Sequence, residues 1–309
     1  MARSMVQQLT YPIRKTTAFG ESKHSDKGQG SKGVRHDGRS YSYGTFKGRL
    51  DTAKQFGSYM ERQHPEIKLA REITRDHIND FLITKAETCR NDTLRTYSSN
   101  LRSLCKEIDK TYHCKLGIKE RDIVTPTVER EPIRTVAMDK EDFARLRESY
   151  TTDSLGDRAL ALERACGGRC EELVTIKGKD IFIEHDRAIV HIEQGKGGRE
   201  RDVYVKDKDS IRELAHIKEI TRDNERVCPI KKDSLHRSLE RHMKDIGIKH
   251  KYPNTSVHAM RKEWAQRIYD QCRAEGMSKL QAIQYVNDQL GHGKDRDVLL
   301  LGRYVQNMH

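Results

Sequence analysis

Long apolar runs are missing from this chain, and so is the pattern of a secretory signal peptide. A helix that crosses a bilayer needs about 20 consecutive apolar residues, so the sequence predicts no membrane span and a cytoplasmic protein. Hydrophobic residues make up only 35% of the 309 residues, and charged residues make up 34%. Typical chains have about 45–50% and about 25% of these two classes. Much of the surface must therefore be charged and solvated.

Paired cysteines and nucleotide-binding glycine motifs are also missing. The seven cysteines form no CxxC pair, and neither Cys166 with Cys170 nor His113 with Cys114 completes a four-ligand metal site. An odd number of cysteines without a secretory signal favours reduced thiols. The glycine cluster at 195–198 matches neither the P-loop pattern nor the GxGxxG fingerprint. The sequence thus predicts no metal and no bound cofactor.

Negative charge is scarce at the beginning of the chain. The net charge is +12, and Met1–Leu50 holds ten lysines and arginines against three acidic residues. A glycine-rich, basic segment with few apolar residues does not fold alone. We therefore predict that residues 1–40 form a basic flexible arm that orders on DNA, or else a solubilising tail. The overall charge favours a phosphodiester partner over a membrane surface.

Apolar residues recur at three- and four-residue steps in the next segment. This spacing predicts helices over about 44–63, 74–87 and 92–112. Together they predict a helical DNA-binding domain over 41–118. The polar residues that follow, with Pro126 and Pro132, predict a linker over 119–137.

A second domain is predicted over 138–309. It should contain strands at 181–183, 188–192 and 201–205, because short β-branched runs there are bounded by turn residues. Helical patterns surround these strands, at 139–150, 155–166, after Gly168, from Ser210, and over 234–246, 257–272 and 278–290. The predicted fold is mainly α with a small β-sheet.

The last fifty residues carry the polar groups that best suit phosphate chemistry. His258 and Arg261 are three residues apart, so a helix places both on one face. They are followed by Leu290-Gly291-His292 and then by Tyr304, near the end of the sequence. Histidines and an arginine can hold an anionic oxygen, and a phenol can attack phosphorus.

In the context of the whole second domain, these residues resemble the tyrosine recombinase (phage integrase) family. That family has an arginine after a helix and a glycine, a lysine in a β-hairpin, His-x-x-Arg, Leu-Gly-His and a nucleophilic tyrosine, in this order. The matching residues here are Arg169, Lys196, His258, Arg261, His292 and Tyr304. The resemblance covers 138–309 as the catalytic domain. It extends to 44–118 only by position, as the core-binding domain.

The resemblance implies a role for each matched residue. Arg169 and Arg261 would clamp the scissile phosphate, a task that suits a planar and always-charged guanidinium. Lys196 would protonate the leaving 5′ oxygen, and His258 would take the proton of Tyr304 or polarise the phosphate with His292.

Ordinary structural roles remain open beside these. Arg169 could form a salt bridge with a nearby glutamate, and Glu172 could orient Arg169 or only stabilise a helical turn. Lys196 could be a hairpin lysine that contacts backbone phosphates. Trp264, the one tryptophan, fits a core position better than a base-stacking platform. Tyr269 and Tyr285 are alternative nucleophiles, but both precede His292 and so break the family order.

The resulting hypothesis is a site-specific DNA recombinase, an integrase of a mobile element associated with the nucleoid. It would cut and rejoin DNA by transesterification through a 3′-phosphotyrosyl intermediate, without ATP or metal. Its partners would be double-stranded DNA with a specific site, further subunits in a tetramer on synapsed DNA, and accessory DNA-bending or directionality factors. Two alternatives are a non-catalytic DNA-binding protein of the same fold and a tyrosine-dependent topoisomerase or resolvase.

Overall fold

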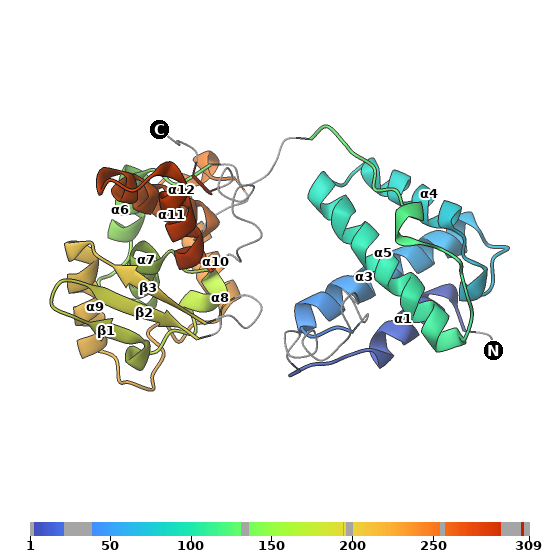
Figure 1. The fold of residues 1–309 in the computed structure, drawn as a ribbon, viewed down its shortest axis with the longest axis horizontal. Helices are drawn as coiled ribbons and strands as arrows, with labels where there is room; N and C mark the ends of the chain where they lie inside the picture. The colour runs from blue at the N-terminus through green and yellow to red at the C-terminus, as the bar shows by residue number, and fades with distance from the viewer. Residues whose placement is uncertain are drawn as a thin grey trace. The chain divides into compact units, whose positions relative to one another are not determined.

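The computed structural model describes residues 3–21, 39–130, 136–193, 195, 200–253, 257–291 and 304–305. The chain divides into two compact units, Met1–Pro132 and Ile133–His309. The first is helical, and the second combines helices with a small β-sheet (Figure 1). The predicted fold class is confirmed. Within the described ranges, no helix is both long enough and apolar enough to cross a membrane.

The helical unit is built from four α-helices and two short 3-10 turns in the described part of the chain. These are α1 (Met5–Lys15), α3 (Tyr43–Gln63), η1 (Ala70–Glu72), α4 (Arg75–Ala86), α5 (Asn91–Tyr112) and η2 (Glu120–Asp122). The bounds of α3, α4 and α5 match the predicted helices to within one residue. Their buried apolar residues form one continuous core.

Helix α1 corrects the expectation that residues 1–40 form a flexible arm. Ser4 caps it with a hydroxyl that accepts a hydrogen bond from the Gln7 amide. Met5, Leu9 and Ile13 lie four residues apart and are at most 4% exposed, so one face of α1 is part of the unit's core. Residues 22–38, the remaining part of the predicted arm, lie outside the described residues.

Pro12 does not break α1, because another residue replaces the hydrogen bond that proline cannot make. A proline in a helix leaves the carbonyl four residues earlier without its donor. That carbonyl belongs to Gln8, and it accepts a hydrogen bond of 2.7 Å from the Tyr112 hydroxyl on α5. The Gln8 side chain also bonds to the backbone at Lys68 and Ala70. Helix α1 is therefore fixed to the unit by polar as well as apolar contacts.

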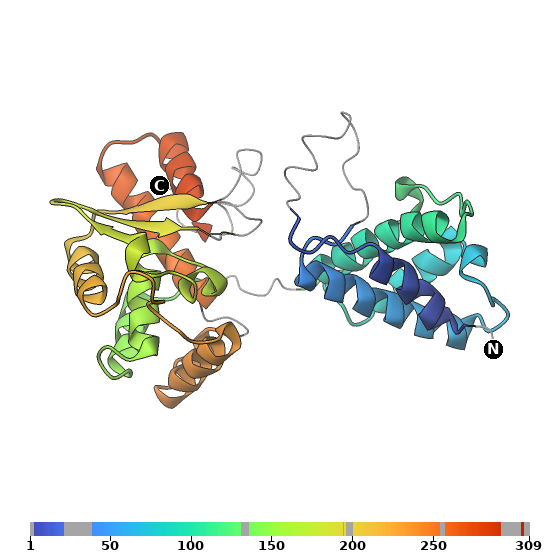
Figure 2. The ribbon, with the colours of Figure 1, turned by 90° about the horizontal axis from the view of Figure 1, so that it is seen from below.

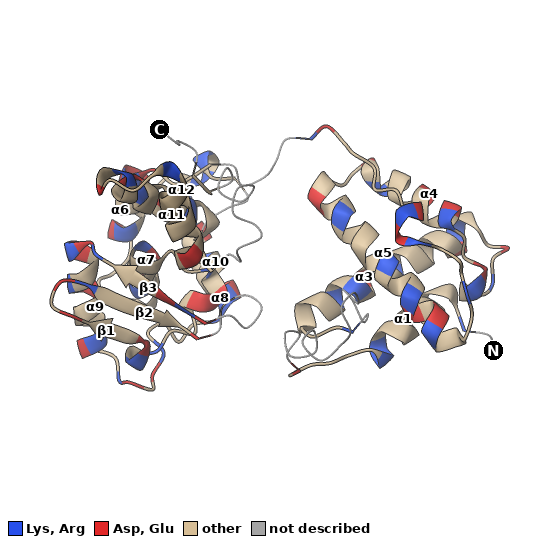
Figure 3. Ribbon diagram, viewed as in Figure 1, with Lys and Arg blue, Asp and Glu red and all other residues tan. Residues whose placement is uncertain are grey.

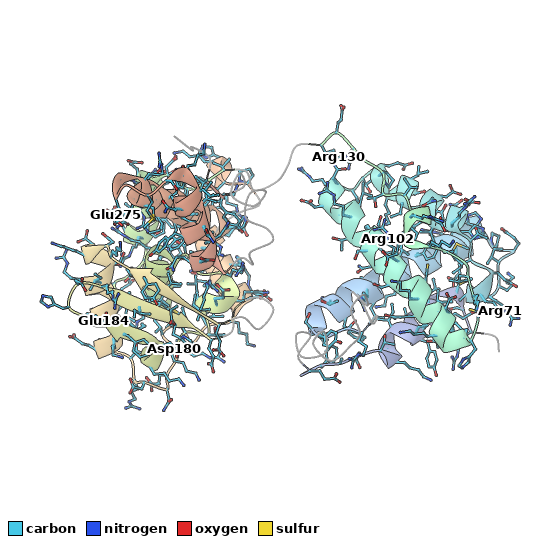
Figure 4. All side chains as sticks on the ribbon, in the orientation of Figure 1. Arg71, Arg102, Arg130, Asp180, Glu184 and Glu275 are labelled. Atoms are coloured by element: carbon cyan, nitrogen blue, oxygen red, sulfur yellow. The ribbon has the colours of Figure 1, made fainter. Side chains whose placement is uncertain are left out.

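The predicted linker at 119–137 is wrong for its first half. Ile123 is 2% exposed within the helical core. Arg102 on α5 donates to the carbonyls of Glu120 and Ile123, and Arg130 donates to the carbonyl of Cys89 (both arginines are labelled in Figure 4). Polar composition suggested a free linker, but the side chains of the helices satisfy its backbone groups.

The second unit contains the predicted strands with the predicted bounds. Its elements are α6 (Lys140–Glu148), α7 (Leu155–Cys166), α8 (Cys170–Leu173), η3 (Gly178–Asp180), β1 (Ile181–Ile183), β2 (Ala188–Ile192), β3 (Arg201–Val205), α9 (Lys208–Glu219), α10 (Lys232–Asp245), η4 (Lys249–Lys251), α11 (Val257–Ala274) and α12 (Lys279–Leu290).

The three strands form an antiparallel sheet in the order β1-β2-β3. One face is buried, and the other exposes Phe182 and Tyr204. Helices α7 and α9 pack against the sheet, and α12 packs beside β3 (Figures 1 and 2). The register pairs Ile192 with Arg201 at one end of the sheet. This end faces α8, where the candidate site lies.

Charges of both signs are interspersed over the described surface of each unit (Figure 3). The buried charges are more informative, because an isolated charge in a protein interior is costly. In the second unit several of them converge on one acidic residue.

Candidate active site

Glu172 is the centre of this cluster. It lies on α8 with a side chain that is only 1% exposed. One carboxylate oxygen accepts 2.7 Å from the Arg169 guanidinium, and the other accepts 2.9 Å from the Arg169 amide. Glu172 therefore both orients Arg169 and closes the first turn of α8, so the two roles that the sequence left open are combined.

Arg201, at the start of β3, makes the second contact with this carboxylate. Its two terminal nitrogens donate to the two oxygens of Glu172 at 3.1 and 2.7 Å, and its Nε donates 2.8 Å to the carbonyl of Gln289 on α12. Burial alone would raise the pKa of Glu172. The hydrogen bonds and charge of Arg201, together with Arg169, outweigh burial and lower this pKa to about 2.

Helix α11 reaches the site by capping the end of α7. The last carbonyls of a helix have no partner within it. Here Arg267 donates 2.6 Å to the Arg164 carbonyl, Trp264 donates 3.1 Å to the Ala165 carbonyl, and Arg261 donates to the Gly167 carbonyl. The three donors are three residues apart on α11, so one face of this helix holds the carboxyl end of α7.

Gly167 is required by the packing at this point. It ends α7 with φ of +54°, and a Cβ atom there would lie 2.4 Å from the ring of Trp264. Trp264 itself is 1% exposed. The prediction of Trp264 as a core residue is confirmed.

Arg261 also joins the end of a second helix. Its other terminal nitrogen donates 2.7 Å to the Leu290 carbonyl at the end of α12. The nitrogen bound to Gly167 lies 3.9 Å from a Glu172 oxygen. A guanidinium at a helix carboxyl end is favoured by the helix dipole. Burial, followed by the nearby charge of Arg169, lowers the pKa of Arg261 to about 10. Its buried Nε has no hydrogen-bond partner among the residues that the structure describes.

Tyr304 lies against His258 and Arg261 of α11. Its ring packs edge-on against His258 with 5.3 Å between centroids, and the Arg261 guanidinium carbon is 5.9 Å from the Tyr304 ring centre. The next residue, Val305, is 1% exposed and belongs to the core of this unit. The structure thus brings His258, Arg261 and Tyr304 together, although the last two are 43 positions apart in sequence.

These residues form a centre with excess positive charge. Three guanidinium groups, those of Arg169, Arg201 and Arg261, surround the one carboxylate of Glu172. Among these four side chains, two positive charges remain uncompensated. A buried excess of this kind stabilises an anion placed beside it, and a phosphate in the act of being attacked is such an anion.

Two predicted site residues, Lys196 and His292, lie outside the described residues. Their described neighbours belong to the site: Arg201 follows Lys196 after five residues, and the carbonyl of Leu290, two residues before His292, is bound to Arg261.

The alternative tyrosines lie elsewhere. Tyr269 is 1% exposed in the core. Burial raises the pKa of Tyr285, whose titratable neighbours are Cys272, Lys206, Glu275 and Tyr204 rather than the arginines of the site.

The sequence interpretation missed Arg201, although a signal was present. Side chains two apart in a strand share a face, and Val203 and Val205 face the core. Arg201 lies on the same face of β3. A charged residue on a buried face requires a partner, which marks it as a candidate for the site.

Comparison with known proteins identifies the family and the fold. The phage integrase family model matches residues 137–306, more than half of the chain. No curated protein matches. Among solved structures, the XerH site-specific recombinase bound to a palindromic difH substrate has a TM-score of 0.66 at 16% identity, over 98% of this chain and 92% of that chain.

Two integrases are similar at comparable levels. A lambda integrase tetramer bound to a Holliday junction has a TM-score of 0.59 at 17% identity, over 83% of this chain and 71% of that chain. The Tn1549 transposon integrase with a circular intermediate DNA has a TM-score of 0.57 at 14% identity, over 98% and 96%. The fold matches that of tyrosine recombinases. The chain belongs to the phage integrase family.

Proposed function

We propose that this protein is a site-specific recombinase that cuts and rejoins DNA with Tyr304 as the nucleophile. The observation that carries the proposal is the packing of the Tyr304 ring on His258 and Arg261, beside the centre of excess positive charge. A phenol has a pKa of about 10 and is a weak nucleophile unless cations stabilise the phenolate. The Arg261 guanidinium carbon lies 5.9 Å from the centre of the Tyr304 ring.

In the first step, the Tyr304 oxygen attacks the phosphorus and the bond to the 5′ oxygen breaks. His258 accepts the phenolic proton, and Lys196 gives a proton to the leaving oxygen. The products are a 3′-phosphotyrosyl bond and a free 5′ hydroxyl. In the second step, a 5′ hydroxyl from another duplex attacks the phosphotyrosine and releases Tyr304. One phosphodiester replaces another, so the reaction needs no ATP.

The arginines differ in access to this phosphate. The Arg169 side chain is 23% exposed, whereas that of Arg261 is 1% exposed and lies beneath the Tyr304 ring. We propose that the scissile phosphate first binds Arg169. The phenol of Tyr304 then moves from its place above Arg261 to the position from which it attacks. Arg261 acts from a fixed place, because two helix ends hold its terminal nitrogens.

The similar proteins support a proposal for the substrate and the assembly. XerH, lambda integrase and the Tn1549 integrase were solved with DNA, and one lambda integrase structure is a tetramer on a Holliday junction. We propose double-stranded DNA with a specific site as the substrate, a tetramer on synapsed DNA, and a mobile element as the source. His292 would assist at the phosphate. Such a protein works in the cytoplasm, at the nucleoid.

The test is trapping on nicked suicide substrates built from the DNA that flanks the gene. Wild-type protein should form a covalent adduct that resists denaturation, and Tyr304→Phe should form none. Tyr285→Phe, a partly buried tyrosine of the same unit, is the matched control and should react as wild type. Wild-type protein that forms no adduct on any of these substrates would refute the enzyme and favour a DNA-binding protein without chemistry. Strand exchange between two duplexes then separates a recombinase from a topoisomerase.

A further inference from the structure

We infer that Arg201 is a positioning residue for strand cleavage, acting through Glu172 on the two arginines proposed to hold the phosphate. This inference depends on the proposed function. It assigns a role to a residue of β3 that lies outside the set of residues matched to the family motif.

The contacts of Arg201 support this role. Its bidentate contact with Glu172 has the geometry that a planar guanidinium and a carboxylate prefer. The same carboxylate orients Arg169 at 2.7 Å. The Arg201 side chain itself is only 8% exposed. All three nitrogens of Arg201 donate to Glu172 or to the Gln289 carbonyl, whereas Arg261 keeps an Nε without a partner among the described residues. Arg201 therefore acts on the substrate through its neighbours.

A second contact joins Arg201 to the other half of the site. Its Nε donates to the Gln289 carbonyl, and Arg261 donates to the adjacent Leu290 carbonyl. The two guanidinium groups therefore hold successive carbonyls at the end of α12. Gly291 follows in a left-handed conformation with φ of +68°, and a Cβ atom there would lie 3.0 Å from the Arg201 side chain. The position of the chain leading to His292 thus depends on Arg201.

Loss of Arg201 should alter the charge of Glu172. The groups facing this carboxylate are Arg169, Arg201, Arg261 and the buried Cys166 thiol. Without Arg201, burial has less opposition and the pKa of Glu172 rises from its value of about 2. A protonated Glu172 no longer attracts Arg169. Cleavage by the variant should therefore weaken as the pH falls, at pH values where wild-type protein is still fully active.

The experiment measures covalent adduct formation on the nicked substrate by the full chain, from pH 5 to pH 9, together with DNA affinity. Arg201→Met should reduce the cleavage rate by about 100-fold, as expected for misplaced groups, while changing the Kd for DNA by less than about threefold. Its acidic limb should move to higher pH. Arg201→Lys keeps the charge but not the bidentate contact, and should fall between wild type and Arg201→Met.

A double mutant tests whether the effect passes through Glu172. If it does, adding Arg201→Met to Glu172→Gln should lower cleavage by less than about threefold beyond Glu172→Gln alone. Arg187→Met is the control, because Arg187 pairs with Glu184 at the opposite end of the sheet and is half exposed (Glu184 is labelled in Figure 4).

Three results overturn the inference while leaving the proposed function intact. They are normal cleavage by Arg201→Met, a lower rate with the wild-type pH profile, and full additivity with Glu172→Gln. The second result would mean that Arg201 only supports the fold. Wild-type protein that forms no adduct refutes the proposed function, and the inference with it.

Discussion

The two units of this protein bury acidic residues in opposite ways. In the helical unit, Glu107 on α5 is 1% exposed and pairs with Arg49 on α3 at 3.3 Å. In the second unit, Glu172 is equally buried but forms ion pairs with three arginines. Among the described residues, the first arrangement pairs one carboxylate with one guanidinium. The second leaves positive charge in excess, which a stable fold does not need.

This difference separates a scaffold from a site. A buried one-to-one ion pair contributes little net stability, since the cost of removing both charges from water offsets their attraction. Uncompensated buried charge costs stability, and it persists where a function uses it. The helical unit is therefore expected to tolerate changes to its buried pair far better than the second unit tolerates changes around Glu172.

The largest effect on stability should come from Glu172→Ala. It leaves three guanidinium groups without their shared carboxylate, and breaking a buried charge network costs about 3–5 kcal/mol. Because the pKa of Glu172 is lowered to about 2 in the folded protein, its stabilising effect is complete above the unfolded pKa of about 4.3 and is lost as the pH falls toward 2. The variant should therefore lose most stability at neutral pH and differ little from wild type near pH 2.

Urea unfolding of the full chain, followed separately for each unit, measures this difference. The matched control is Glu107→Ala with Arg49→Met, which removes both members of the helical unit's pair. A larger loss in that control than in Glu172→Ala would contradict the distinction between the two units.

Arg169 and Arg261 should differ although both are proposed to bind the phosphate. Arg169→Ala should lower cleavage by about 10²–10³-fold, the effect of removing one donor to a reacting oxygen, with DNA affinity and stability nearly unchanged. Arg261→Ala should lower cleavage as much and also destabilise the second unit, because the ends of α7 and α12 lose their capping donor. Equal losses of DNA affinity and cleavage in Arg169→Ala would reduce this residue to an ordinary phosphate contact.

Local patterns predicted most of this fold, and only tertiary contacts explain the rest. The strands and the long helices have their predicted bounds because apolar periodicity reports burial directly. Helix α1 was missed because its four-residue apolar spacing lies in a segment whose average composition is polar, and because Pro12 is tolerated only through Tyr112, one hundred residues later. No local pattern could reveal that partner.

The site shows the same limit. The order of Arg169, His258, Arg261 and Tyr304 suggested a common site. The structure brings Arg169 and Arg261 to Glu172, and it places the Tyr304 ring against His258 and Arg261. Their roles in catalysis remain predictions. Spacing alone could not show that the ends of two helices fix Arg261. The carbonyls that it binds belong to Gly167, 94 positions earlier, and to Leu290, 29 positions later.

Helix α1 offers a test of the helical unit as a conventional core. Leu9 is fully buried, so Leu9→Ala should lower the free energy of unfolding of this unit by about 2–5 kcal/mol. Cleavage at a temperature where the unit is still folded should be unchanged. Arg14→Ala, on the exposed side of α1, is the control for helix propensity. If Leu9→Ala has no effect on stability, α1 is not part of the core and the basic-arm interpretation regains support.

The smallest predicted effect is a gain in stability from Glu163→Met on α7. Glu163 is 1% exposed, and neither carboxylate oxygen has a hydrogen-bond partner among the described residues. Burial, with the nearby Glu263, raises its pKa well above the usual value, so the folded protein keeps a proton that the unfolded chain releases. Its burial is therefore tolerated below the unfolded pKa and costs stability as the pH rises toward the folded pKa.

Methionine fills a similar volume without an unpaired polar group. Glu163→Met should raise the free energy of unfolding by about 1–3 kcal/mol at pH 7.5, and by less at pH 4, where the carboxyl group is protonated in both states. Thermal unfolding at the two pH values measures the gain, with the exposed Glu148→Met on α6 as the control. A loss of stability at pH 7.5 would show that Glu163 is ionised and paired in the folded protein. Glu163 would then balance part of the excess positive charge of the arginines around Glu172.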